Sequence, residues 1–106
     1  MTDVVLVLTT VSDAPTAENL ARVLVDEHLA ACVNVQGPMT SFYRWKGQVE
    51  RDRERQVVIK TTRDRLAALE TRLAALHAYE LPELIVVPVA GGSDRYLNWV
   101  RSETAD

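Results

Sequence analysis

Two runs of consecutive apolar residues constrain the fold more than any other feature of this sequence. They are VVLVL at residues 4–8 and LIVVPV at residues 84–89. In a strand with one face in water, apolar and polar side chains alternate. Neither run alternates, so both faces of a sheet built from them must be shielded from water.

Hydrophobic periodicity predicts four strands and three helices. Helical spacing of apolar residues runs from Pro15 to about His28, and a leucine stripe predicts a second helix after Thr62. The segment from 93 to 103 is expected to form a short terminal helix. The predicted strands are Val4–Val11, the apolar stretch 29–45 with a break at Gly37-Pro38, Val49–Thr61 and Leu84–Ala90.

Residues typical of caps and turns separate these elements. Ser12 or Asp13 can cap the first helix, Thr62 the second and Ser93 the third. Lys46-Gly47 is typical of a hairpin turn between the second and third strands. The predicted order is therefore βαββαβ with a C-terminal helix and a long central hairpin, which is an α+β ferredoxin-like sandwich.

This topology leaves one face of the sheet without a cover. Right-handed crossovers place both long helices on the same face, and the terminal helix is too short to shield the other. An apolar face of that size requires a partner. We expect a homo-oligomer of closed symmetry, built from one domain that spans residues 1–106.

The composition and the apolar runs indicate which binding partners and which cellular compartment to expect. The net charge is −3, which gives no basic footprint for nucleic acid. One cysteine permits no intramolecular disulfide, and the start MTDVVLVLTT is not typical of a signal peptide. The apolar run 84–90 is too short to span a bilayer. We expect a cytoplasmic protein that uses neither nucleic acid nor membrane.

The only soft metal ligands in the chain are Cys32, His28, His77 and two methionines, of which Met39 is the internal one. A copper site can use one cysteine and one or two histidines, also across a subunit boundary. The simpler interpretation is that Cys32 is a small hydrophobe in a strand and that both histidines end helices. The residues alone leave both interpretations open.

Catalysis has weaker support. A thiol nucleophile at Cys32 would need a histidine and a third group, and Glu80 or Glu83 could act with His77 in acid–base chemistry. No catalytic motif of known spacing is present. We expect that the chain is not an enzyme.

Five segments in order resemble the CutA family of divalent-cation tolerance proteins. They are LAACVNV, SFYRWKG, ERQVVIKTT, HAYELPELIVVPV and YLNWV, which together cover about residues 4–100. The resemblance implies a homotrimer of ferredoxin-like subunits, similar to the PII signalling proteins, with hairpins that join neighbouring subunits. It also implies a role in tolerance to divalent metals, with copper as a bound ion in some members.

The resemblance also implies which residues serve the site. Cys32 and His77 correspond to the family's cysteine and to the histidine of its H-P-Y-E-x-P-E segment, and they are the expected metal ligands. The residues expected either in a ligand cleft between subunits or in the subunit interface itself are Trp45, Glu54, Lys60, Tyr79, Glu83, Tyr96 and Trp99. Two positions depart from the family: Ala78 replaces the usual proline, and Gly37-Pro38 reverses the usual order.

Two functions follow as hypotheses. The first is a trimeric, metal-responsive binding or regulatory protein in which Cys32 and His77 contact copper or another divalent cation. The second is a PII-like sensor of a small molecule or a protein partner, which uses the cleft between subunits and has no metal role.

Overall fold

The structure is a computed structural model that describes residues 2–105. Its element order is strand, helix, two strands, helix, strand, helix, as the sequence predicts. The bounds are β1 Val4–Val11, α1 Ala14–Asp26, β2 Cys32–Trp45, β3 Gln48–Thr62, a 3₁₀ turn Arg63–Arg65, α2 Leu66–Leu76, β4 Ile85–Pro88 and α3 Asp94–Thr104.

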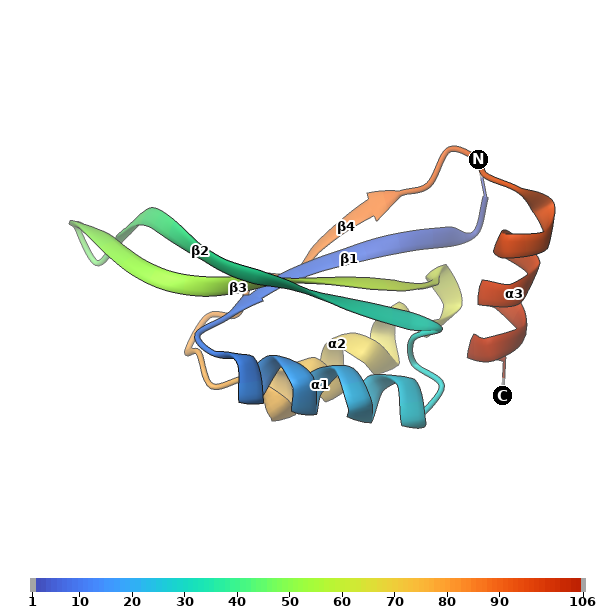
Figure 1. Ribbon diagram of the computed structural model, residues 1–106, viewed down its shortest axis with the longest axis horizontal. Helices are drawn as coiled ribbons and strands as arrows, with labels where there is room; N and C mark the ends of the chain where they lie inside the picture. Colours follow the sequence, from blue (N-terminus) through green and yellow to red (C-terminus); the bar gives the residue numbers. More distant parts are fainter. Residues whose placement is uncertain (1, 106) are drawn as a thin grey trace.

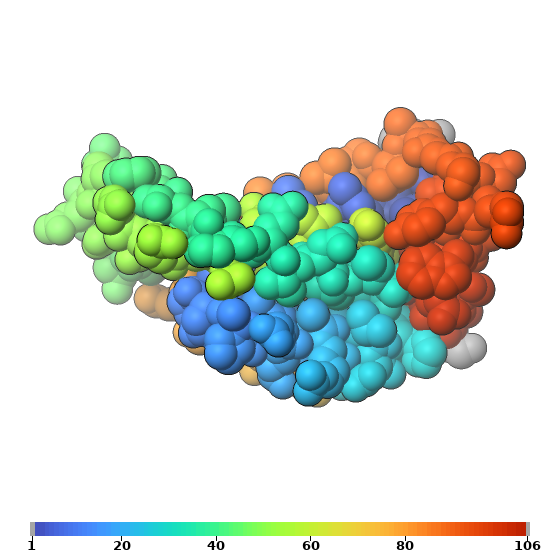
Figure 2. All heavy atoms as spheres, viewed as in Figure 1, coloured from blue at the N-terminus to red at the C-terminus, as the bar shows by residue number. Residues whose placement is uncertain are grey.

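The four strands form one antiparallel sheet in the order β2-β3-β1-β4. Helices α1 and α2 lie side by side under one face of the sheet, and α3 stands at one end of it (Figure 1). The α+β ferredoxin-like sandwich is therefore confirmed. The β2–β3 hairpin extends far beyond the helices at the opposite end from α3 (Figures 1 and 2).

The core lies between the sheet and the two long helices. Alternate residues of β1 and β3 point into it, because side chains in a strand alternate between faces. The helices contribute residues at helical spacing. The buried core residues are Val5, Val7, Val11, Ala17, Leu20, Leu24, Leu29, Ala30, Val57, Ile59, Leu69 and Leu73.

The other face of the sheet carries apolar side chains with no helix above most of them. Strand register places Leu6 beside Val87 and Leu8 beside Ile85, with Val58 across from Leu8. Ile85 is 50% exposed, and the other four are only partly buried. We call this surface the open face. A single chain leaves it in contact with water, so one chain does not supply the cover that the two apolar runs predict for this face.

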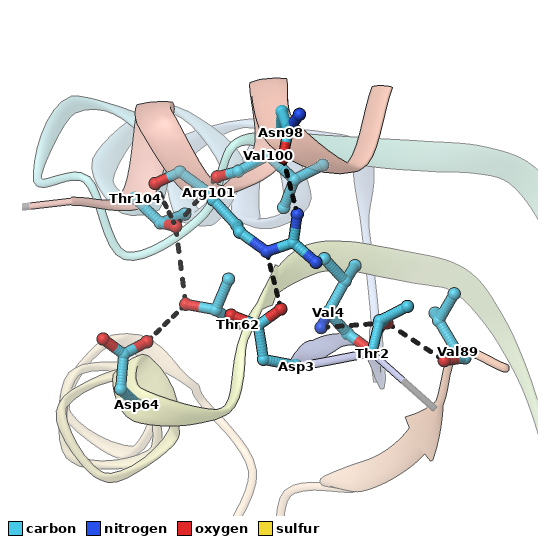
Figure 3. A network of polar contacts seen from close by, with 10 residues as sticks. All are labelled: Thr2, Asp3, Val4, Thr62, Asp64, Val89, Asn98, Val100, Arg101 and Thr104. Carbon is cyan, nitrogen blue, oxygen red and sulfur yellow. Dashed lines mark hydrogen bonds and ion pairs between the residues drawn. The ribbon is translucent and has the colours of Figure 1, made fainter. Parts of the chain in front are cut away.

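Helix α3 is fastened across the end of the sheet by a polar network (Figure 3). Arg101 Nε donates a hydrogen bond to Asp3 Oδ1 over 2.7 Å, and the hydroxyls of Thr62 and Thr104 lie 3.4 Å apart. Leu97 and Val100 are buried against Val4 and Ala31 on the inner side of α3. The helix therefore covers only the edge of the open face next to the start of β1.

The hairpin turn at Lys46-Gly47 has the backbone conformation that the sequence predicts. Lys46 has φ +49° and Gly47 has φ +83°. Two consecutive positive φ values are typical of the tight turn whose twist matches that of the strands. Upstream, the register between β2 and β3 shifts between Val35 and Pro38, so the predicted break at Gly37-Pro38 is a β-bulge within one strand.

Several element boundaries differ from the sequence-based expectation; β2, for example, begins at Cys32 and not at residue 29. Helix α1 ends at Asp26, and His28 lies outside it with φ +59°. Strand β3 is one residue longer at each end than the predicted Val49–Thr61. Strand β4 spans only Ile85–Pro88 and is shorter than the predicted Leu84–Ala90. Thr62 precedes a 3₁₀ turn, and its hydroxyl donates to Asp64 Oδ1 instead of capping a helix N–H.

Candidate functional site

A groove of about 970 Å³ opens on the open face at the hairpin end of the molecule. Its walls are the outer half of the hairpin and the segment 78–85, which joins α2 to β4. Both polar and aromatic side chains line the groove. The lining residues are Thr10, Met39, Ser41, Phe42, Tyr43, Arg44, Trp45, Glu54, Gln56 and 78–85.

Glu54 lies at the floor of this groove. The residue is only 7% exposed, and its Oε2 accepts a hydrogen bond of 2.7 Å from the Tyr79 hydroxyl. Burial and this bond to the carboxylate raise the pKa of Tyr79 far above its ordinary value, so the phenol stays protonated and keeps donating. Glu54 and Tyr79 therefore lie in one site within a single chain.

His77 joins three parts of the structure. Its Nε2 lies 2.8 Å from the carbonyl oxygen of Thr10, and its Nδ1 lies 3.1 Å from the backbone nitrogen of Tyr79. A carbonyl only accepts and an N–H only donates, so Nε2 carries the proton and Nδ1 accepts. Both ring nitrogens of the neutral imidazole are thus engaged in holding the segment after α2 against the end of β1.

Cys32 lies at the other end of the open face. It begins β2 as a partly buried free thiol, and the register pairs it with Lys60, which in turn pairs with Leu6. His77 bonds to Thr10, four residues further along β1, which is about 13 Å along a strand. One chain therefore does not bring Cys32 and His77 into one site.

Lys60 belongs to the Cys32 end and contacts α3. Its ammonium nitrogen lies 5.7 Å from the centre of the Tyr96 ring and 3.4 Å from the Tyr96 hydroxyl. Trp99 stacks at a tilt against Tyr96, with 5.4 Å between ring centres. Both aromatic residues are exposed by more than two fifths. Lys60, Tyr96 and Trp99 thus form one cluster, separate from Glu54 and Tyr79.

Trp45 and Glu83 belong to the groove. Trp45 ends β2 at the tip of the hairpin, with the Lys46 ammonium 5.7 Å from its ring centre. Glu83 lies in the 78–85 wall together with Ala78. Because Nδ1 of His77 already fixes the amide of Tyr79, the turn is held there without the proline that Ala78 replaces.

Two partners in the groove region were not among the residues that the sequence singled out as site residues. The carbonyl of Thr10 anchors His77, and Asp52 accepts a short hydrogen bond from Tyr43 that raises the pKa of Tyr43 to about 12. A backbone carbonyl leaves no signal in the sequence. Asp52 could have been found from strand alternation, which places it on the same face of β3 as Glu54.

The geometry does not supply a cation site in one chain. Among residues 2–105, no three His, Cys, Asp or Glu side chains cluster in a way that could hold a metal ion. No helix in the same range is long and apolar enough to cross a membrane. What one chain does supply is an acidic, aromatic groove at one end of the open face and a basic, aromatic cluster at the other.

Comparison with known proteins agrees with this architecture over most of the chain. The family model described as CutA1 divalent ion tolerance protein matches residues 5–103. The chain is 43% identical over 99 residues to the divalent-cation tolerance protein CutA of Thermus thermophilus, covering 93% of this chain and 96% of that protein.

Two further relatives extend the comparison. The crystal structure of CutA from Xylella fastidiosa has a TM-score of 0.95 and 46% identity, and the match covers 98% of this chain and all of that one. Protein CutA, chloroplastic, of Arabidopsis thaliana is 40% identical over 94% of this chain, which spans 55% of that protein's length. The chain therefore belongs to the CutA1 divalent ion tolerance protein family.

Proposed function

We propose that this protein acts as a homotrimer that binds a divalent cation and responds to it, without catalysing a reaction. The observation that carries the proposal is the open face, where apolar side chains of β1, β3 and β4 are left without a cover in one chain. Contiguous apolar surface of this kind is typical of subunit interfaces. The names of the relatives supply the link to divalent cations.

The proposed ligands of the cation are Cys32 and His77 from different subunits, with copper as the preferred ion. A thiolate and an imidazole are ligands that suit copper. Within one chain the two residues are at opposite ends of the open face, so an assembly of chains has to bring them together. A cation at Nδ1 of His77 also has to displace the amide of Tyr79 from that nitrogen.

The test is a copper titration of the assembled protein. Wild type, Cys32→Ala and His77→Ala are compared by calorimetry, with Cys32→Ser as a variant that keeps the volume of the side chain. We expect both alanine variants to bind copper at least about tenfold more weakly, because each removes one of few ligands. Unchanged affinity in both would contradict this assignment.

A second candidate function is a PII-like sensor of a small molecule or protein partner. The groove supports it, because it combines aromatic walls with a buried carboxylate at its floor, as ligand sites commonly do. A ligand that binds the folded state raises the melting temperature by mass action. A screen of nucleotides and metabolites that produces no shift in wild type would count against this candidate.

The absence of catalysis and the cytoplasmic location stay predictions. The first follows from the lack of a catalytic motif and is tested by the reactivity of Cys32 toward thiol reagents, since a nucleophilic thiol must be accessible and partly ionised. The second is tested by fractionation of cells that express the full protein. The Arabidopsis relative is named for the chloroplast, so relatives differ in compartment.

A further inference from the structure

We propose that one face of the projecting β2–β3 hairpin is a docking surface for an acidic, extended segment of a partner protein. We call it the arginine face and define it by Arg44, Arg51, Arg53 and Arg55. It lies on the side of the hairpin away from the Glu54 carboxylate, so it is separate from the groove floor and from the proposed cation site. It therefore adds a binding activity to the proposed function.

Strand alternation gathers three of these arginines on one side. Arg51, Arg53 and Arg55 alternate with acidic residues along β3, and successive side chains of a strand point to opposite faces. Val57, two residues after Arg55, points into the core between the sheet and the helices. The arginines therefore lie on the helix side of the ribbon, in the part of the hairpin that extends beyond the helices (Figure 1).

Strand β2 adds a fourth arginine and an aromatic ring to the same side. The register pairs Arg44 with Val49, and it pairs the next outward-facing residue, Phe42, with Arg51. Side chains that are directly opposite in this way share a face of the ribbon. The guanidinium carbon of Arg51 lies 5.8 Å from the centre of the Phe42 ring, which is 69% exposed. This stacking orients the guanidinium and leaves ring surface for an apolar residue of a partner.

No acid among residues 2–105 forms an ion pair with the arginine face. The acids that alternate with the arginines are engaged on the opposite side, where Asp52 accepts a hydrogen bond from Tyr43 and Glu54 accepts one from Tyr79. Three of the four arginines are exposed, and Arg55 is half-buried. Like charges at neighbouring positions repel one another. An anion from outside the chain would therefore stabilise this face.

The spacing of the arginines matches that of an extended polypeptide. Every second residue of a strand lies about 6.8 Å from the last, because each residue rises by about 3.4 Å. One face of a second extended segment has the same repeat, so aspartate or glutamate at alternate positions meets Arg51, Arg53 and Arg55 one to one. A planar guanidinium binds a carboxylate through two parallel hydrogen bonds, which fixes the register of such a segment.

Charge favours a short protein segment over nucleic acid as the occupant. The chain has a net charge of −3, and Glu50, Asp52 and Glu54 lie on the other side of the same two-stranded ribbon. A nucleic acid carries a negative charge on every nucleotide and extends past the arginines over the acidic remainder of the surface. An acidic segment places its charges only opposite the arginines. The hairpin stands clear of the body of the molecule, so such a segment can reach it (Figure 2).

The test measures the binding of two labelled peptides to the full chain by fluorescence anisotropy. The first peptide has glutamate at every second position, with threonine and one phenylalanine between. The second has the same composition with its glutamates in one block. We expect the alternating peptide to bind at least about tenfold more tightly, because only its carboxylates match the arginine repeat. Equal affinity for the two peptides would show diffuse attraction without a docking register and would overturn the proposal.

A pair of double variants locates the binding surface. Arg51→Glu/Arg53→Glu should bind the alternating peptide at least about tenfold more weakly than wild type, because like charges then face each other. The matched control Arg22→Glu/Arg95→Glu makes the same change in net charge at exposed positions on α1 and α3. It should bind within about twofold of wild type, since charges beyond a Debye length are screened. Loss of binding in both double variants, or in neither, would contradict the proposal.

Two further measurements separate the other occupants. A labelled oligothymidylate of about ten nucleotides is titrated into wild type. Tighter binding of this strand than of the alternating peptide would assign the face to nucleic acid and contradict the proposal. Circular dichroism and sedimentation of both double variants should match wild type. A lower mass of the Arg51/Arg53 variant alone would show that the face joins copies of this chain, which would also contradict the proposal.

Discussion

At the scale of single residues, His77 shows how a side chain with metal-binding chemistry can have a structural role. Its two ring nitrogens tie the segment after α2 to the end of β1 and to the amide of Tyr79. Tyr79 in turn holds Glu54. The position of the groove floor therefore depends on the neutral form of one imidazole.

Replacement of His77 by alanine should lower the free energy of unfolding by about 1–3 kcal/mol. The reason is that the carbonyl of Thr10 and the amide of Tyr79 both lose their partner. Urea denaturation at a fixed protein concentration measures the change. His28→Asn is the control, because His28 is exposed, has a positive φ that asparagine tolerates, and makes one side-chain hydrogen bond, from Nδ1 to the carbonyl of Glu103, where His77 makes two. Equal stability of His77→Ala and wild type would show that the bridge contributes nothing.

The Asp3–Arg101 pair gives a prediction about pH. The hydrogen bond from Arg101 lowers the pKa of the Asp3 carboxyl below its ordinary 3.8. A depressed pKa in the folded state contributes stability above the unfolded pKa, and this contribution is lost as pH falls through the folded pKa. Melting curves of wild type and Asp3→Asn should therefore converge below about pH 4. Because the pair is half exposed, the difference near pH 7 should be at most about 1 kcal/mol.

Candidate site residues could be listed from the sequence, but their grouping could not. Glu54 and Tyr79 meet in the groove, whereas Lys60, Tyr96 and Trp99 form a second cluster at the opposite end of the sheet. A sequence motif names residues but does not say how far apart they lie in the folded chain. Only the register of β1, β2 and β3 shows that the two groups are separate in one chain.

At the scale of elements, the hairpin depends on its turn. Lys46 and Gly47 both have positive φ values. Glycine adopts such values readily, whereas residues with a Cβ disfavour them. Helices and strands themselves were predictable, because periodicity is strong in α1, α2 and β1. Their ends were not: the apolar spacing continues to His28, although the backbone leaves the helix two residues earlier.

Gly47→Ala should destabilise the protein by about 1 kcal/mol, because alanine disfavours a φ of +83°. No atom lies within 4 Å of an added Cβ, so the effect is conformational and not steric. Gly37→Ala is a matched control with equal space and no positive φ. Thermal unfolding of the two variants separates them. If the Gly47→Ala protein has the same melting temperature as the Gly37→Ala protein, the positive φ at Gly47 does not disfavour alanine.

At the scale of the whole molecule, the account depends on the open face. Two apolar runs without alternation predicted a sheet that is dry on both sides, and the structure leaves Leu6, Leu8 and Ile85 on the side that α1 and α2 do not cover. The need for a cover could be predicted from the sequence. The surfaces that meet could not, because they depend on how the hairpin and α3 project from the sheet.

A mass measurement in solution tests this central claim most directly. Sedimentation equilibrium of wild type at micromolar concentration should give about 35 kDa, three times the 11.8 kDa of one chain. Leu8→Glu, which places a charge in the middle of the open face, should shift the mass toward one chain while the helical circular dichroism signal is retained. A wild-type mass of 11.8 kDa across the same concentration range would contradict the account.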